Sequence, residues 1–266
     1  MAPALSVGPK IELIALRGLP IVEAGCDVAG ALCAALDAMA IALEPCDVLV
    51  IASTLVSRAE GRYVDLGAVE PGDAARRLAV EVDKDPRLVE VILRDTAHIS
   101  RAHRGALIVR HRLGFVSANA AVDASNAVPA SAGAGSGPWV LRMAEDPDGS
   151  ARRLRAAVEA HTGARPVGVV LSDSLGRPFR LGSVGAAVGV SGVPALVDHR
   201  GKQDLFGRPL EATMTGLADQ LAAAADLLAG QADEGTPATL IRGLRFDETD
   251  SAASDLLRPQ DQDLYA

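Results

Sequence analysis

Asp123 and Asp173 are the side chains of this sequence best suited to hold a hard cation. Proteins usually bind Mg²⁺ or Mn²⁺ through one or two carboxylates, while substrate phosphates and water complete the shell. Ser174 and Gln231 would add a hydroxyl and an amide oxygen. Each residue alone also has an ordinary structural explanation, because loop aspartates often cap nearby backbone and a glutamine at a helix end is often solvated. Together they predict a divalent-metal site, provided that the fold brings them to one place.

Arg58, Arg177 and Arg180 could neutralise phosphate groups, because a guanidinium group makes bidentate contacts with them. The usual alternative is a surface arginine that faces solvent or a carboxylate. The glycine-rich run Gly182–Gly192 contains no lysine, so it favours close packing of backbones over phosphate binding.

Three apolar runs that are typical of strands each end in polar residues. Val167–Leu171 leads into Ser172–Ser174, and Gly176–Pro178 then predicts a turn. Asp47–Ala52 and Ala106–Arg112 end in the same way, the latter shortly before Asp123. Ligands tend to bind where strands of α/β and α+β folds end, so these segments are expected to form the site.

Helices and further strands must hold these segments in place. The spacing of apolar residues, with Asp27 as N-cap and Gly230 as the terminating glycine, predicts the helices. They are expected at Asp27–Leu43, Pro71–Val82, Pro86–Arg94, Pro147–His161 and Glu211–Gly230. Further strands are expected at Ile11–Leu16, Val193–Val197 and Ala238–Phe246.

Composition excludes several classes of protein. The chain has 266 residues, is 49% hydrophobic and carries a net charge of -8, and only 3% of its residues are aromatic. Clustered cations and stacking platforms for nucleic acid are therefore not expected. The longest apolar stretch is interrupted by Asp37, and no secretory signal is evident, so we expect neither a membrane span nor export. Three cysteines without metal-type spacing suit reduced thiols in a cytoplasmic protein.

Several familiar catalytic motifs are absent from the sequence. It contains no P-loop, no dinucleotide-binding glycine motif after a strand, no zinc-type histidine spacing and no nucleophile elbow.

Five motifs together resemble the coenzyme F420-0:L-glutamate ligase (gamma-glutamyl ligase) family. They occur in the order of the family and span nearly all of residues 11 to 246. The motifs are Gly18–Pro20, Val56–Arg62, Ala118–Asn126, Ser172–Pro178 and Ala229–Gln231.

The resemblance implies an α+β fold with mixed sheets and packed helices, assembled as an intertwined homodimer. It assigns residues 1–246 to one ligase-like domain, which could have two lobes, and leaves 247–266 as an acidic, polar tail that we expect to be mobile. The low-complexity stretch Pro129–Pro138 could be a linker or a flap over the site, and its composition does not decide between them.

The resemblance also implies an activity: GTP phosphorylates the terminal carboxylate of coenzyme F420-0, and the amine of L-glutamate then displaces the phosphate. Mg²⁺ or Mn²⁺, one or two per site, and K⁺ are the implied cations. Asp123 and Asp173 would hold one metal, Ser174 and Gln231 would contribute to a second, and Arg177 would join the two aspartates as a catalytic residue. The implied GTP-binding residues are Leu19, Pro20, Ile21, Val22, Ser53, Arg58, Asn126, Ala229, Gly230 and Gln231.

The sequence departs from the family at four positions near these motifs. Thr54 and Arg58 stand where the family usually has lysine, so one positive charge is lost and one is kept with a different geometry. Ala121 replaces a glycine, and Ser174 replaces a threonine while keeping the hydroxyl. These departures leave open whether the nucleotide is GTP or ATP. They also leave open a relative that joins another acid and amine, and a non-catalytic protein that binds a nucleotide or a deazaflavin.

Overall fold

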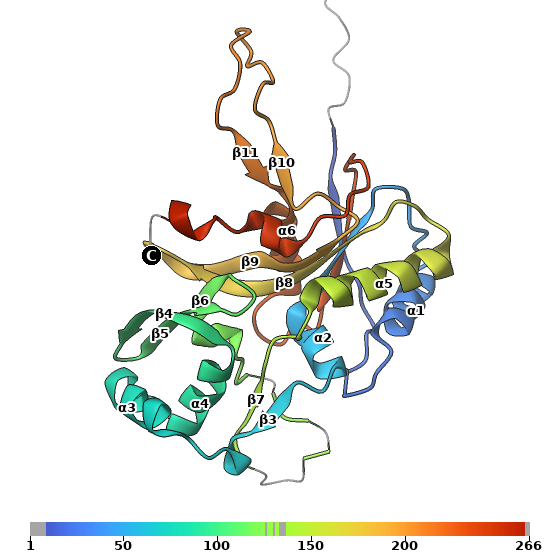
Figure 1. Cartoon of the computed structure of the whole chain (residues 1–266). Helices are drawn as coiled ribbons and strands as arrows, with labels where there is room; N and C mark the ends of the chain where they lie inside the picture. The colour runs from blue at the N-terminus through green and yellow to red at the C-terminus, as the bar shows by residue number, and fades with distance from the viewer. Residues whose placement is uncertain (1–8, 126, 130, 133–136, 264–266) are drawn as a thin grey trace, which may run out of the picture.

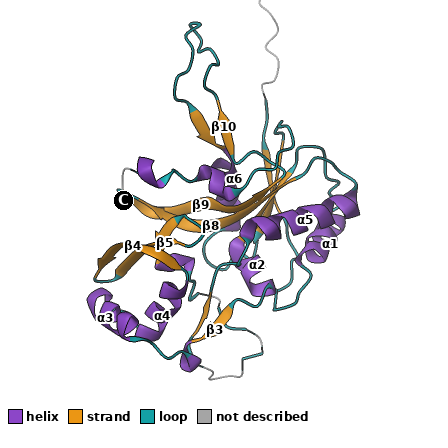
Figure 2. Cartoon of the chain, in the orientation of Figure 1, coloured by secondary structure: helices purple, strands orange, loops and turns teal. Residues whose placement is uncertain are grey.

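The computed structural model describes residues 9–125, 127–129, 131–132 and 137–263. Asn126 and residues 130 and 133–136 lie outside this part, so the choice between a linker and a flap at Pro129–Pro138 stays open. The described residues form a mixed α+β structure with six α-helices and several sheets, which confirms the α+β part of the predicted fold, while the intertwined homodimer stays a prediction (Figures 1 and 2).

A five-stranded sheet forms the centre of the molecule. Its order is β1, β12, β2, β8, β9, in which β2 and β8 are parallel and the other neighbours are antiparallel. These strands are β1 (Glu12–Ala15), β12 (Ala238–Arg242), β2 (Val48–Ala52), β8 (Gly168–Arg177) and β9 (Arg180–Ser191).

Helices cover both faces of this sheet, which explains why β2 is a continuous apolar run. Leu49 and Ile51 pack into one core with helices α1 and α5, whereas Val48 and Val50 pack into another with α6. Alternate side chains of a strand point to opposite faces, so a strand buried on both must be apolar throughout. The helices are α1 (Val28–Ala38), α2 (Ser53–Ala59), α5 (Pro147–Thr162) and α6 (Leu217–Ala229).

A smaller lobe has its own hydrophobic core. Helices α3 (Asp73–Val82) and α4 (Pro86–Arg94) contribute Ala75, Val89 and Ile92 to this core. They pack with a three-stranded sheet of β4 (Thr96–His103), β5 (Ala106–His111) and β6 (Val116–Ala118). The pair β3 (Tyr63–Asp65) and β7 (Trp139–Leu141) joins this lobe to the central sheet at the lower part of Figure 1.

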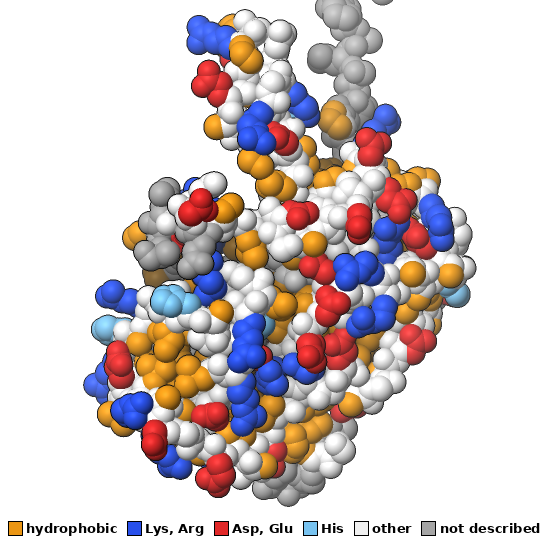
Figure 3. All heavy atoms as spheres, viewed as in Figure 1, with side chains coloured by type: hydrophobic (Ala, Val, Ile, Leu, Met, Phe, Trp, Pro, Cys, Tyr) orange, Lys and Arg blue, Asp and Glu red, His pale blue; other side chains and the backbone are white. Residues whose placement is uncertain are grey.

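A two-stranded arm projects from the body beyond β9. It consists of β10 (Leu196–Asp198), β11 (Met214–Gly216) and the chain between them. Figure 3 shows the arm standing clear of the body, with charged and apolar side chains on its surface. Leu205 and Phe206 in the arm are 99% and 86% exposed.

The tail beyond Asp247 contacts both lobes. Glu248 pairs with Arg155 of α5, and Asp263 pairs with Arg110 of β5. The tail therefore forms ion pairs with the rest of the protein, which its acidic composition did not indicate.

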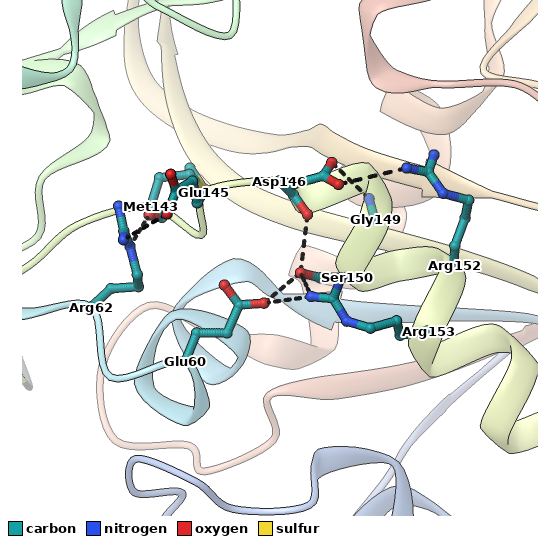
Figure 4. A network of polar contacts seen from close by, with 9 residues as sticks. All are labelled: Glu60, Arg62, Met143, Glu145, Asp146, Gly149, Ser150, Arg152 and Arg153. Atoms are coloured by element: carbon teal, nitrogen blue, oxygen red, sulfur yellow. Dashed lines mark hydrogen bonds and ion pairs between the residues drawn. The ribbon is translucent and has the colours of Figure 1, made fainter.

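A polar network joins the end of α2 to the start of α5 (Figure 4). Ser150 and Arg153 both donate to Glu60, at 2.5 and 3.0 Å. Arg62 donates to the carbonyl oxygen of Met143 at 3.1 Å. The network fixes α2, whose other end carries Ser53, relative to the central sheet.

Several element boundaries differ from the sequence predictions: the helix predicted to reach Leu43 ends at Ala38, and the strand predicted to reach Phe246 ends at Arg242. Two further differences concern β8 and α6. The strand predicted to end at Leu171 continues as β8 to Arg177, because β9 pairs with it as far as Arg180. The helix predicted from Glu211 begins at Leu217, since the preceding residues complete the arm. Asp173 therefore lies on an extended strand and not on a loop.

None of the helices in the described ranges combines the length and apolar character that a membrane span requires.

Candidate functional site

A cavity of about 730 Å³ opens where the parallel strands β2 and β8 end. Its wall is built from five separate parts of the chain: residues 19–22, 50–58, 117–125, 172–176 and 225–239. Small-molecule sites generally have volumes of this order.

Most of the residues predicted for the site line this one cavity. They are Leu19, Pro20, Ile21, Val22, Ser53, Arg58, Asp123, Asp173, Ser174, Ala229, Gly230 and Gln231. Asn126 lies outside the described residues. The cavity thus gathers segments that are far apart in the sequence, although their individual roles stay predictions.

Arg177 is absent from the wall of the cavity as the described residues define it. It lies at the far end of β8, where its guanidinium group donates to the carbonyl oxygen of Leu181 at 3.3 Å. The extension of β8 places this residue at the end of the hairpin, paired with Arg180 of β9. Its catalytic role stays a prediction.

Asp173 is held among other acidic groups. Burial, together with the negative charges of Asp123 and Asp226, raises its pKa to about 6. Hydrogen bonds from the backbone N–H of Ser174 and the side chain of Ser53 act in the opposite direction. The carboxylates are close enough to affect one another, which is the arrangement expected of a cation site.

Asp123 is fixed by the backbone on both sides. Its amide and carbonyl groups bridge to Leu141 at 2.9 and 2.7 Å. Its side chain accepts from the N–H and the hydroxyl of Ser125 at 2.7 and 2.5 Å. The carboxylate of Asp123 therefore caps the nearby backbone, as loop aspartates often do. Asp123 also lines the cavity.

The turn before Asp123 is strained. Asn119, Ala120 and Ala121 have φ values of 54°, 52° and 54°, in the left-handed region that costs an L-residue about 1–2 kcal/mol. Glycine would adopt this backbone more easily, so the structure places Ala121 where a glycine is favoured. Such strain is common at ligand sites.

Ser174, Gln231 and Asp226 form a chain of hydrogen bonds along the wall. The hydroxyl of Ser174 donates to Oε1 of Gln231 at 2.9 Å, and Nε2 of Gln231 donates to Oδ1 of Asp226 at 3.0 Å. Asp226 was not identified from the sequence. Asp226 lies in α6 among residues predicted to form an apolar stripe, so the sequence did not indicate a role in the site. Its contact with Gln231 depends on how the chain leaves the helix.

Arg58 contacts the segment at the opposite wall. Its Nε donates to the carbonyl oxygen of Val22 at 2.8 Å, and its guanidinium group pairs with Glu23 at 3.1 Å. It also lies 5.8 Å from the centre of the Tyr63 ring. Arg58 therefore holds the segment 19–22 in place as well as lining the cavity.

Two hydroxyl groups in the wall have no hydrogen-bond partner among the described residues. They belong to Ser117 and Thr239, which are both buried. Buried hydroxyls are normally satisfied, so a bound ligand or water is the natural partner for these two.

The donor set fits a divalent cation. Among the described residues no group of three or more His, Cys, Asp or Glu side chains is arranged as a metal site. The set predicted here has only two carboxylates, with hydroxyl and amide oxygens beside them, which suits a metal that keeps waters and substrate phosphates.

The fold and the cavity define an α+β protein with an acidic pocket for a small ligand. A model of the F420-0:gamma-glutamyl ligase family matches residues 18–243. The chain belongs to this family, whose members are bond-forming enzymes.

Curated relatives cover most of the chain. It is 42% identical over 257 residues to the coenzyme F420:L-glutamate ligase of Methanothermobacter thermautotrophicus, covering 96% of this chain and 98% of the relative. It is 50% identical over 203 residues to the protein of that name from Methanopyrus kandleri, covering 76% and 77% of the two chains. The Archaeoglobus fulgidus protein of that name is 36% identical over 255 residues, or 96% of each chain.

Proposed function

We propose that this protein is a GTP- and divalent-metal-dependent ligase that joins L-glutamate to the phospholactyl carboxylate of coenzyme F420-0. Family membership and the names of the relatives support the substrates. The observation that carries the mechanism is the convergence of Asp123 and Asp173 with the predicted GTP-binding segments in one cavity.

The reaction would proceed through an acyl phosphate. A carboxylate oxygen of F420-0 takes the γ-phosphoryl group of GTP, and GDP leaves. The amine of glutamate then attacks the activated carbonyl carbon, so that a C–N bond forms and inorganic phosphate departs. Activation is needed because a free carboxylate is a poor electrophile.

The residues of this chain would share three tasks. Asp123 and Asp173 would hold the first Mg²⁺ or Mn²⁺, and Ser174 and Gln231 would contribute to a second. The metals would neutralise the charge on the transferring phosphoryl group. The segments at 19–22 and 229–231, with Arg58, would orient the nucleotide, and K⁺ is a further cation that the assay should include.

The assay combines the protein with GTP, MnCl₂, KCl, L-glutamate and F420-0. We expect GDP and a product that is heavier by one glutamyl residue. Asp173→Asn and Asp123→Asn should each lower the rate by about 100-fold or more while circular dichroism stays native, because a developing charge loses its stabilisation. A native protein that releases neither GDP nor product with Mg²⁺ or Mn²⁺ would overturn the proposal.

We also propose that the protein is a homodimer and acts in the cytoplasm. The exposed apolar side chains of the arm favour contact with a second copy. All three cysteines are free, which fits a reducing compartment.

A further inference from the structure

Asp226 connects the last turns of α6 to two other elements. Its Oδ1 accepts from Nε2 of Gln231 at 3.0 Å, and its carboxylate also accepts from the backbone N–H of Gly185 in β9. The residue lines the cavity, and its charge reaches Asp173.

The carboxylate of Asp226 determines which way the amide of Gln231 faces. An ionised carboxylate can only accept hydrogen bonds, so the NH₂ end of the amide must point toward it. The hydroxyl of Ser174 can donate or accept and therefore does not discriminate between the two orientations. A reversed amide would set Oε1 against the carboxylate and lose the bond.

As a result, Oε1 of Gln231 faces Ser174, where it accepts at 2.9 Å. These are the two side chains that the proposed function assigns to the second metal. An amide binds a hard cation through its oxygen and not through its NH₂ group. The orientation seen here is the one that binding requires.

We propose that Asp226 is a positioning residue that holds the amide of Gln231 with its oxygen directed to a divalent cation. The inference rests on the proposed function. Asp226 acts through Gln231 and not as a ligand, in keeping with the absence of a three-carboxylate metal cluster among the described residues. Partners that orient metal ligands typically change affinity by about 10- to 100-fold when they are replaced.

The test compares Asp226→Asn with Asp219→Asn. Asp219 lies two turns earlier on α6, and its Oδ1 accepts from the backbone N–H of Ala187 in β9 at 2.9 Å. Both substitutions keep an oxygen for the strand and remove one charge from the helix. Only the first allows the amide of Gln231 to turn over, because asparagine can either donate or accept.

Mn²⁺ binding is measured on the protein alone, from the free-ion signal in electron paramagnetic resonance. We expect Asp226→Asn to weaken Mn²⁺ binding by about tenfold or more and Asp219→Asn to bind as the native protein does. In the ligase assay the first variant should need more Mn²⁺ for half-maximal rate, with kcat at saturating Mn²⁺ within about threefold of native.

Two further variants guard against a simple folding defect. Asp226→Glu keeps a group that only accepts, so it should retain most of the Mn²⁺ affinity. In a Gln231→Leu background, Asp226→Asn should have no further effect on Mn²⁺ binding, since its target is gone.

Equal Mn²⁺ binding by the Asp226→Asn and Asp219→Asn variants would overturn the positioning role alone, as would additive effects with Gln231→Leu. A native protein that binds no Mn²⁺ and forms no product would overturn the proposed function and this inference with it.

Discussion

At the scale of single residues, Asp173 makes the free energy of unfolding depend on pH. Its pKa in the folded protein is about 6, compared with 3.8 for an unperturbed aspartate. Between these two values the folded state holds the proton more tightly than the unfolded chain. The free energy of unfolding therefore falls as the pH rises through this window, and the penalty is complete above it.

Asp173→Asn should consequently make the metal-free protein more stable at pH 7.5 by about 1–3 kcal/mol, because asparagine has no charge to bury. The difference should shrink to less than about 1 kcal/mol near pH 4, where the carboxyl group is protonated in the folded state and about half protonated in the unfolded chain. Urea denaturation in EDTA at the two pH values measures it.

Mn²⁺ provides the control for this experiment, since it should stabilise the native protein at pH 7.5 and leave the variant unchanged. A variant that is less stable than the native protein at pH 7.5 would contradict the assignment of a destabilising charge.

At the scale of elements, the glycines of β9 allow helices to lie close to the sheet. A Cβ atom at Gly185 would come within 2.4 Å of the carbonyl oxygen of Ala222 in α6, and one at Gly189 within 2.6 Å of that of Pro147 in α5. The glycine-rich run thus serves close packing of backbones, as the sequence indicated.

Gly189→Ala should lower the free energy of unfolding by about 1–3 kcal/mol, because the added methyl group has to displace the first turn of α5. Gly176→Ala is the matched control on the partner strand, since in the described part of the chain no atom other than those of its chain neighbours lies within 4 Å of its Cβ position. Thermal unfolding of both variants measures the difference. Equal stability of the two would show that α5 can move away at little cost.

The sequence predicted elements well where local chemistry defines them. Asp27 accepts from the N–H of Gly30 as the N-cap of α1, and Pro86–Arg94 is a helix with the predicted bounds. The sequence did not predict elements that depend on pairing with a distant part of the chain. Thr96–His103 shows no strand signal, with most of its side chains exposed, yet it pairs along β5 as β4.

The same division holds for the site. The predicted segments 19–22, 172–174 and 229–231 could be chosen from motifs, and the fold brings them to one cavity. The position of Arg177 outside the cavity wall could not be foreseen, because it depends on how far β8 and β9 pair. The role of Asp226 could not be foreseen either, because it depends on where α6 ends.

At the scale of the whole molecule, the arm exposes apolar side chains that the described residues of a single chain do not cover. Leu205 and Phe206 expose apolar surface in the arm, which projects from the body (Figure 1). A second copy would cover this surface if the proposed homodimer forms.

Light scattering after size-exclusion chromatography should give the mass of a dimer for the native protein. Replacing Leu205 and Phe206 with glutamate should shift it toward the monomer, because charge is costly in an apolar interface. Val80→Glu is the control, since this apolar residue is also exposed, at 85%, but lies on α3. A dimer that persists in the double variant would place the interface elsewhere.

The order of strands in the central sheet also affects how the protein is made. β12, near the end of the chain, lies between β1 and β2 and pairs with both. Until a ribosome has synthesised Ala238–Arg242, one edge of the wholly apolar strand β2 has no partner. Such an edge can pair with other chains. We therefore expect a chain that stops before Ala238 to aggregate, even though it already contains Asp123, Asp173, Ser174 and Gln231.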